Sequence, residues 1–300
     1  MLHTLLTEHG RPDLEMVRGA GGLAGGIGGP GECGGACAPL MMLGLLHGGD
    51  LTANGLPRVV LLGREYLRRF GQVHGSTRCT EIGTKGIPSC LQAMCTAPAL
   101  LREVRSREDE LHTTLPPEVS QAHLSVLSAF EQQGFHCAHR VLEELGGVLS
   151  VTEDLRRASW PFQGGMVLSG GTCGALTAGV MAASAKIGGV ERSTLRTLRL
   201  VAFLLLDEER AMDDRVNAFN PVIRIARGLS SWFIDRYGTT RCAELTGTNF
   251  ATSESAERFR AAEVDRCEAI ARSVADRVRE VLEEEERLGS RAGSSPQKRP

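Results

Sequence analysis

Aromatic residues, surplus charge and long apolar runs are all scarce in this chain of 300 residues. Aromatics make up 4%, and 34 Lys and Arg stand against 36 Asp and Glu. A balanced charge gives no reason to expect a polyanionic partner. The most apolar runs, residues 38–46 and 201–206, are far shorter than the ~18–20 residues that cross a bilayer. We therefore expect a globular protein that binds neither nucleic acid nor membrane.

Several sequence signals are also missing. The first residues lack the basic stretch and apolar segment of a secretory signal, which favours a cytoplasmic location. No Gly-Lys-Ser/Thr occurs, which excludes a Walker loop. No Cys-x-x-Cys-His occurs, so covalently attached haem is not expected. Alternating apolar and polar runs typical of strands are hard to find. These absences leave helices as the main predicted structure.

Helical spacing of apolar residues is clear in several segments. From residue 256 to 288, apolar side chains follow steps of three and four residues, which predicts one stripe of an amphipathic helix. Segment 173–186 is rich in small residues and predicts a helix that its neighbours approach closely. Further helices are expected over residues 121–145, 195–211 and 222–236. We predict an all-α fold of two related helical units, with glycine-rich turns before the helices that carry the motif.

Cysteine and glycine are plentiful by contrast, at 9 and 36 residues. An odd number of cysteines in a cytoplasmic chain argues against a disulfide scaffold and favours metal ligands or redox groups. The alternative is that they are small buried hydrophobes, as free cysteines often are.

An internal repeat groups these cysteines. Three cysteines of the first part recur in the same order in the second, as the pairs Cys33 and Cys173, Cys79 and Cys242, and Cys90 and Cys267. The pairing predicts a first unit over 1–104, a linker over 105–122, a second unit over 123–288 and a disordered tail over 289–300. We expect the units to pack as an internal pseudo-dimer, and a homo-oligomer is left open.

Residues 19–35 read GAGGLAGGIGGPGECGG. A dinucleotide loop needs a strand before it and a helix after it, and neither is indicated here. In both units glycines flank a cysteine at the expected start of a helix. Unpaired N–H groups at that place stabilise a thiolate, so we expect Cys173 to have a low pKa. A tight turn between packed helices is the plainer interpretation.

The second unit resembles a family of redox-active proteins named for the cysteine signature C-GCAxxG-C-C. The residues that match are Cys137, Cys173 with Gly174 and Ala175, Cys242 and Cys267, although Ala178 stands where the motif closes on glycine. In the first unit Gly35 replaces the alanine, Ala38 replaces the glycine, and the early cysteine is absent. The resemblance implies redox or iron–sulfur chemistry on a helical fold.

Three hypotheses compete for the four cysteines of the second unit. In the first, the four cysteines hold an iron–sulfur cluster. In the second, they form a dithiol centre in which Cys173 attacks and another cysteine resolves. In the third they bind zinc, which is disfavoured because no two cysteines of this unit are closely spaced. Arg241 and Arg266, and also His136 and His139, lie beside these cysteines; surface or capping roles are the plainer interpretation of all four. A helical adaptor with structural cysteines is the non-redox alternative. The redox hypotheses imply a redox partner protein or a small thiol or electron donor.

The first unit is expected to be degenerate. Its candidate second site comprises Cys33, Cys37, Cys79 and Cys90, with Cys37 in place of the missing early thiol because it lies four residues after Cys33, on the same helix face. Pro98 is expected to kink any helix shared by Cys90 and Cys95. Either this unit has lost its site, or the true start codon lies upstream of Met1.

Overall fold

The computed structural model describes residues 1–52, 55–114, 117–188, 221–248, 250 and 252–293. Throughout these residues the regular secondary structure is helical, and the only β-type pairings are isolated bridges. The predicted all-α class is therefore confirmed. The helix expected over 195–211 lies outside the described residues.

The first half of the chain begins with short helices and then forms three long ones. Its elements are α1 (Leu2–Glu8), α2 (Leu14–Gly19), η1 (Gly21–Leu23), α3 (Ala24–Ile27), α4 (Gly34–His47), α5 (Arg58–His74), α6 (Cys79–Gly83) and α7 (Ile87–Ser106). Cys90 and Cys95 share helix α7, which continues past Pro98 as one helix to Ser106.

In its described residues the second half repeats this order, with further helices between the repeated ones. The connection is made by α8 (Glu108–Thr114) and α9 (Pro117–Gln132), followed by α10 (Cys137–Leu145), α11 (Glu153–Ser159), η2 (Trp160–Phe162), α12 (Gly174–Ile187), α15 (Pro221–Tyr237), α16 (Cys242–Thr246), α17 (Ser253–Ala262) and α18 (Val264–Gly293). Interval 105–122, expected as a linker, is thus largely helical.

Two expected helices are each divided in the structure. Segment 121–145 breaks between α9 and α10, where Gly134 adopts a φ of +56°, a conformation that favours glycine. Segment 256–288 breaks at Glu263, between α17 and α18. Helix α18 continues to Gly293, beyond the expected start of the tail, and residues 294–300 lie outside the described part of the chain.

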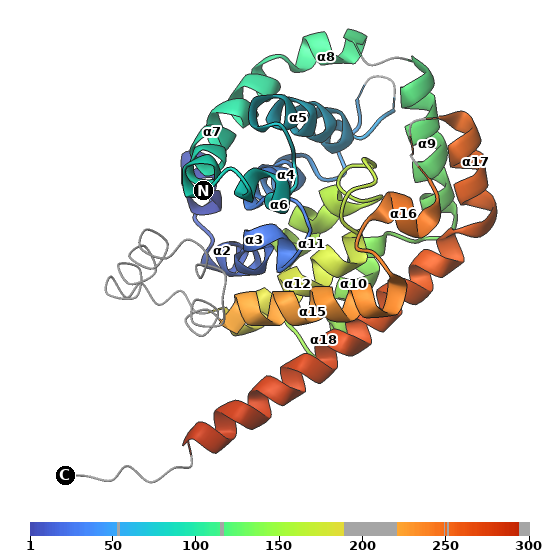
Figure 1. Ribbon diagram of the computed structural model, residues 1–300. Helices are drawn as coiled ribbons and strands as arrows, with labels where there is room; N and C mark the ends of the chain where they lie inside the picture. Colours follow the sequence, from blue (N-terminus) through green and yellow to red (C-terminus); the bar gives the residue numbers. More distant parts are fainter. Residues whose placement is uncertain (53–54, 115–116, 189–220, 249, 251, 294–300) are drawn as a thin grey trace.

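The two halves pack across one another. Helices α4 and α12 are their buried centres, and each is contacted by elements of the other half. Helix α2 and η1 of the first half pack on α12, while α11 and η2 of the second half pack on α4 (Figure 1). The buried apolar side chains therefore form one continuous core.

Equivalent positions of the two halves meet where the halves join. Glu32 and Thr172 are counterparts in the repeat, and the Glu32 carboxylate accepts from the Thr172 backbone N–H at 3.1 Å and from its hydroxyl. The bridge between Glu32 and Arg78 in the first half has its counterpart in the bridge between Thr172 and Arg241. Contact between equivalent residues is the mark of a two-fold axis, and the two halves meet here at counterpart positions.

Glycine allows backbones to approach closely at this junction. A Cβ added at Gly28 would lie 2.2 Å from the backbone of α15, and one at Gly22 would lie 2.6 Å from Val180 of α12. The glycine-rich segment therefore serves the packing of one half on the other, which favours the plainer interpretation of it.

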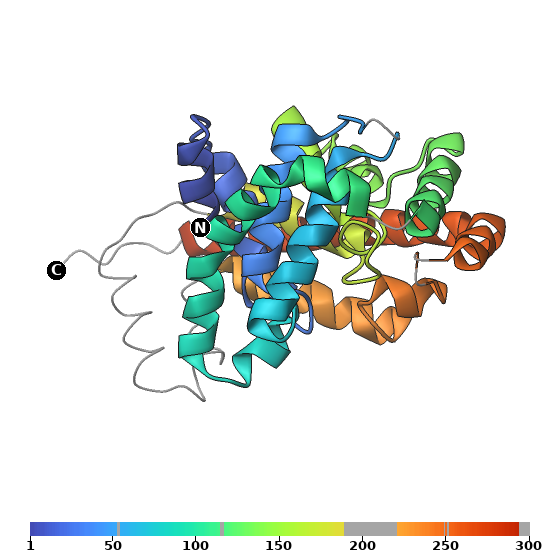
Figure 2. The same ribbon diagram turned by 90° about the horizontal axis from the view of Figure 1, so that it is seen from above.

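Helices α9 and α17 lie side by side at one end of the molecule, next to α16 and far from the N-terminus, as two views of the ribbon show (Figures 1 and 2). They have no counterparts in the first half. None of the helices in the described ranges is long and apolar enough to cross a membrane.

Candidate functional site

Four cysteines of the second half line one small cavity. Cys137 is the first residue of α10, Cys173 precedes α12 as its N-cap, Cys242 begins α16, and Cys267 lies in the first turn of α18. All four line the same cavity of about 20 Å³, room for about one water molecule. The structure thus brings together the cysteines that the sequence pattern grouped.

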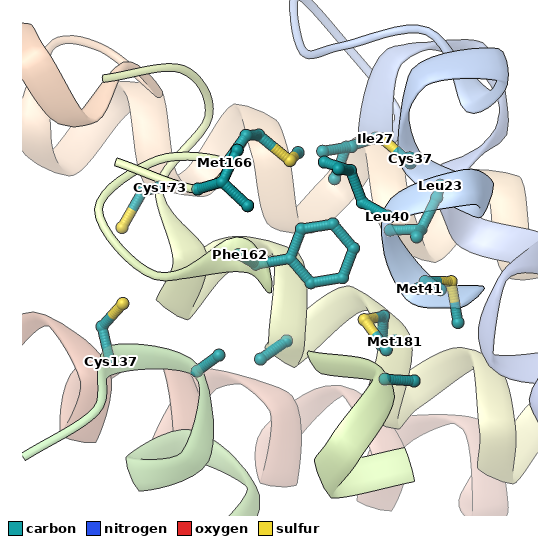
Figure 3. Packing of buried hydrophobic residues seen from close by; sticks show 14 of the residues in the cluster. Leu23, Ile27, Cys37, Leu40, Met41, Cys137, Phe162, Met166, Cys173 and Met181 are labelled. Carbon is teal, nitrogen blue, oxygen red and sulfur yellow. The ribbon is translucent and has the colours of Figure 1, made fainter. Parts of the chain in front are cut away.

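The cavity is closed by apolar side chains. Phe130 of α9 and Phe259 of α17 lie edge to face, with ring centroids 5.0 Å apart, and both line the cavity. Cys137, Cys173 and Cys242 are buried and Cys267 is partly exposed. The sulfurs of Cys137 and Cys173 point toward one another (Figure 3).

A left-handed turn holds the cavity wall between η2 and α12. From Gly164 to Leu168 every residue has a positive φ, including Met166 at +66° and Val167 at +48°. Non-glycine residues pay about 1–2 kcal/mol each for this conformation. The turn places the Gly164 backbone N–H at the Cys137 sulfur, and a Cβ at Gly165 would lie 2.6 Å from the Cβ of Cys242.

Gly174 leaves room for a sulfur. A Cβ at this residue would lie 2.3 Å from the Phe162 carbonyl oxygen and 2.7 Å from the Cys137 sulfur. A Cβ at its counterpart Gly34 would come no closer than 3.8 Å to the neighbouring atoms. The motif glycine after Cys173 is therefore needed for the approach of Cys137.

Burial dominates the pKa values of these thiols. Burial and, to a smaller extent, the nearby Cys173 raise the pKa of Cys137 to about 12, although backbone N–H groups such as that of Gly164 lower it. Burial likewise raises the pKa of Cys242 and of Cys267 well above the usual range. The sulfurs of Cys137 and Cys173 contribute to the rise of both pKa values.

The low pKa expected for Cys173 is wrong. Backbone N–H groups of Ala175 and Leu176 do lower the pKa of Cys173, as a helix start should, but burial outweighs them and the net shift is upward. At neutral pH the four groups are thiols rather than thiolates.

The two histidines beside Cys137 fix the start of α10. The Nδ1 of His136 accepts from the His139 N–H at 3.3 Å, so its Nε2 carries the proton and donates to the Trp160 carbonyl at 3.2 Å. His139 stacks on His136 at 3.9 Å and bonds the Arg156 carbonyl at 3.0 Å. Burial lowers the pKa of both, which are neutral groups that position Cys137.

The two neighbouring arginines lie on the surface. Arg241 and Arg266 are 43% and 54% exposed and pair with glutamates at 3.5 Å. Arg266 slightly lowers the pKa of Cys267. Within the described residues, no three Cys, His, Asp or Glu side chains are arranged to share a metal ion.

The first half assembles a partial counterpart. Cys33, Cys79 and Cys90 lie close enough that Cys33 and Cys90 both raise the pKa of Cys79, which burial brings to about 12. Cys37 is fully buried and its thiol is directed to the Glu32 carbonyl at 3.8 Å, near Cys33 and Cys79. Among the described residues of the first half there is no helix equivalent to α9 or α17, and Cys79 and Cys90 are partly exposed.

Sequence reasoning missed the closing helices and the left-handed turn. Phe130 and Phe259 are two of few aromatics, and they lie in segments without a counterpart in the first half, which is the signal that singles them out. Nothing in the sequence marks Met166–Leu168 as left-handed, because these are ordinary apolar residues there.

Comparison with known proteins agrees with this arrangement. The family model described as Putative redox-active protein (C_GCAxxG_C_C) matches twice, over residues 1–104 and 135–281. No curated protein and no solved structure matches the chain. The two matches cover most of the sequence and coincide with the two halves of the fold. The chain therefore belongs to the C_GCAxxG_C_C family and carries two copies of its domain.

Proposed function

We propose that the second half is a thiol/disulfide redox centre with Cys137 and Cys173 as its reactive pair. The observation that carries the proposal is the convergence of four cysteines on one closed cavity, with these two sulfurs facing each other (Figure 3). Four thiols buried only for packing have no reason to share a single cavity.

In the proposed reaction, the two thiols lose two electrons and two protons and form one S–S bond. A disulfide on the partner accepts both and becomes two thiols, so one S–S bond breaks for each that forms. The partner is a redox protein or a small disulfide; in reverse, a dithiol or small thiol returns the electrons.

Access begins at Cys267, because it is the partly exposed member of the group. A mixed disulfide formed there is displaced by a second cysteine, and the bond passes inward by the same exchange. Phe130 and Phe259 keep water and bulky reagents from the inner sulfurs. The raised pKa values keep these sulfurs protonated until an exchange partner arrives.

The nine cysteines support a reducing compartment such as the cytoplasm, since none is joined in a disulfide. An iron–sulfur cluster on Cys137, Cys173, Cys242 and Cys267 stays a prediction, supported by the four-thiol donor set. The adaptor alternative also stays, and it requires all four thiols to be inert.

The test is a thiol count on anaerobically purified protein in dithiothreitol redox buffers, with iron, sulfide and zinc assayed on the same sample. We expect two thiols to disappear and return reversibly. Cys173→Ser removes this change, while the exposed Cys95→Ser, the matched control, keeps it. Iron and sulfide in stoichiometric amounts would overturn the dithiol proposal in favour of the iron–sulfur cluster. Unreactive thiols in a protein without metal would overturn both the dithiol and the cluster.

A further inference from the structure

A second, larger cavity lies where the two halves join. It is a cleft of about 470 Å³, lined from both halves and separate from the cysteine cavity. Its charged lining consists of Arg64, Arg68, Arg78, Arg241, Glu32 and Glu81. Four guanidinium groups and two carboxyl groups thus line the cleft. Arg68 is held by Glu65 at 2.6 and 2.7 Å, so the surplus positive charge belongs to Arg64, Arg78 and Arg241.

The negative charge in the cleft is already engaged. Glu32 accepts from both the N–H and the hydroxyl of Thr172. Burial raises the pKa of Glu32, which favours its uncharged form. Glu81 is 54% exposed and lies 3.7 Å from Arg78. Neither carboxyl forms an ion pair with Arg64 or Arg241; Arg241 pairs instead with Glu244 at 3.5 Å.

Arg64 is a half-buried cation without an acidic partner among the described residues. It donates to the Leu168 carbonyl at 2.7 Å, and it forms no ion pair with any residue that the structure describes. Burial lowers the pKa of Arg64. A guanidinium that is partly removed from water is stabilised by a neighbouring anion. A bound anion would therefore supply the counter-charge that Arg64 lacks.

Arg78 and Arg241 enter the cleft as a pair. They occupy equivalent positions in the repeat, each immediately before a cysteine and each bridged to one of Glu32 and Thr172. Their ion pairs, at 3.7 and 3.5 Å, are long and partly exposed. Such pairs contribute little to stability. Arg78 also donates to the Pro30 carbonyl at 3.3 Å, which leaves its other N–H groups, and those of Arg241, available to a ligand.

We propose that this cleft binds a small oxyanion, a phosphate ester or a dicarboxylate, held between Arg78 and Arg241 with Arg64 at its inner end. Planar guanidinium groups match the oxygens of carboxylates and phosphates in pairs. A ligand with two negative ends suits two arginines related by a two-fold axis. The proposal does not depend on the redox function, because no cysteine lines the cleft.

The test is isothermal titration of the full chain with inorganic phosphate, pyrophosphate and succinate at constant ionic strength, with sodium chloride as the reference salt. We expect saturable binding of at least one probe. Stronger binding of phosphate or pyrophosphate identifies the phosphate form, and stronger binding of succinate identifies the dicarboxylate form.

Arg78→Gln and Arg241→Gln should each weaken binding by about tenfold or more. Arg224→Gln is the matched control, because it removes one charge from a partly exposed ion pair outside the cleft. Cys173→Ser should bind normally, which separates this proposal from the redox one. No saturable heat for any probe, or an equal loss in Arg224→Gln, would overturn it.

Discussion

Cys173 lies between two opposing influences on its pKa. Two backbone N–H groups at the start of α12 favour the thiolate, and complete burial favours the thiol. The sequence reveals the first influence, since glycines around a cysteine indicate a helix start. The second depends on α9 and α17 closing over the site, which is a tertiary effect that no local pattern shows.

Alkaline pH should destabilise the reduced protein. In the folded state burial raises the pKa of Cys137 to about 12, from the ordinary thiol value of 9.0. Between these values the folded state binds more protons than the unfolded state, so the free energy of unfolding falls as pH rises from about 9 towards about 12. Urea unfolding of the reduced protein at pH 8, 9 and 10 measures this decline. A free energy of unfolding that rises over this interval would contradict the assignment.

Glu32 is expected to respond differently to two substitutions. Glu32→Ala leaves the Thr172 N–H and hydroxyl without their acceptor and should cost about 1–3 kcal/mol. Glu32→Gln keeps an acceptor without a buried charge. Burial raises the pKa of Glu32 above 4.5. The wild type therefore loses stability as the pH rises from 4.5 and the buried carboxyl ionises. The glutamine variant does not ionise, so its free energy of unfolding should rise relative to that of the wild type between pH 4.5 and 8. Urea unfolding of all three proteins at pH 4.5 and 8 tests this; a glutamine variant that loses ground at pH 8 would contradict it.

At the scale of elements, the two halves build the left-handed turn before α4 and α12 from different residues. The first half has three glycines with positive φ and one left-handed apolar residue, Ile27 at +58°, whereas the second half places Met166, Val167 and Leu168 in the left-handed region. Strained backbone of this kind is found mostly at functional sites. It lies against Cys137 and Cys242, in the half whose four cysteines are complete.

The counterpart glycines Gly174 and Gly34 provide a matched pair of substitutions. Gly174→Ala should destabilise the protein by about 2 kcal/mol or more, because its Cβ would meet the Phe162 carbonyl at 2.3 Å. Gly34→Ala should be neutral or stabilising by up to about 1 kcal/mol, because alanine favours the helix and space is open. Thermal unfolding of both variants measures the difference, and equal effects would show that Cys137 does not require the gap.

Much of the helical layout can be predicted from spacing, as the agreement over α12 and α15 shows. The breaks at Gly134 and Glu263 could not be placed, because apolar periodicity continues across both. The repeat predicted which cysteines gather. It did not reveal that α2 crosses to α12 and α11 to α4, since such packing leaves no local signal in either segment.

For the whole molecule, the crossed packing makes the halves interdependent. Chains 1–114 and 117–300 expressed separately should be largely unfolded or aggregated, because each centre helix loses a neighbour from the other half. Coexpression should restore a complex with the helical content of the intact chain. Circular dichroism and size-exclusion chromatography measure both states. Cooperative unfolding of either half alone as a monomer would contradict this interdependence.

The central claim concerns two sulfurs in one cavity, and peptide mapping tests it most directly. The full chain is oxidised in a dithiothreitol redox buffer, its remaining thiols are blocked, and it is digested without reduction for mass spectrometry. The account predicts a linked pair of peptides carrying Cys137 and Cys173, absent after reduction. If both cysteines carry the blocking group under every redox condition, the account is contradicted.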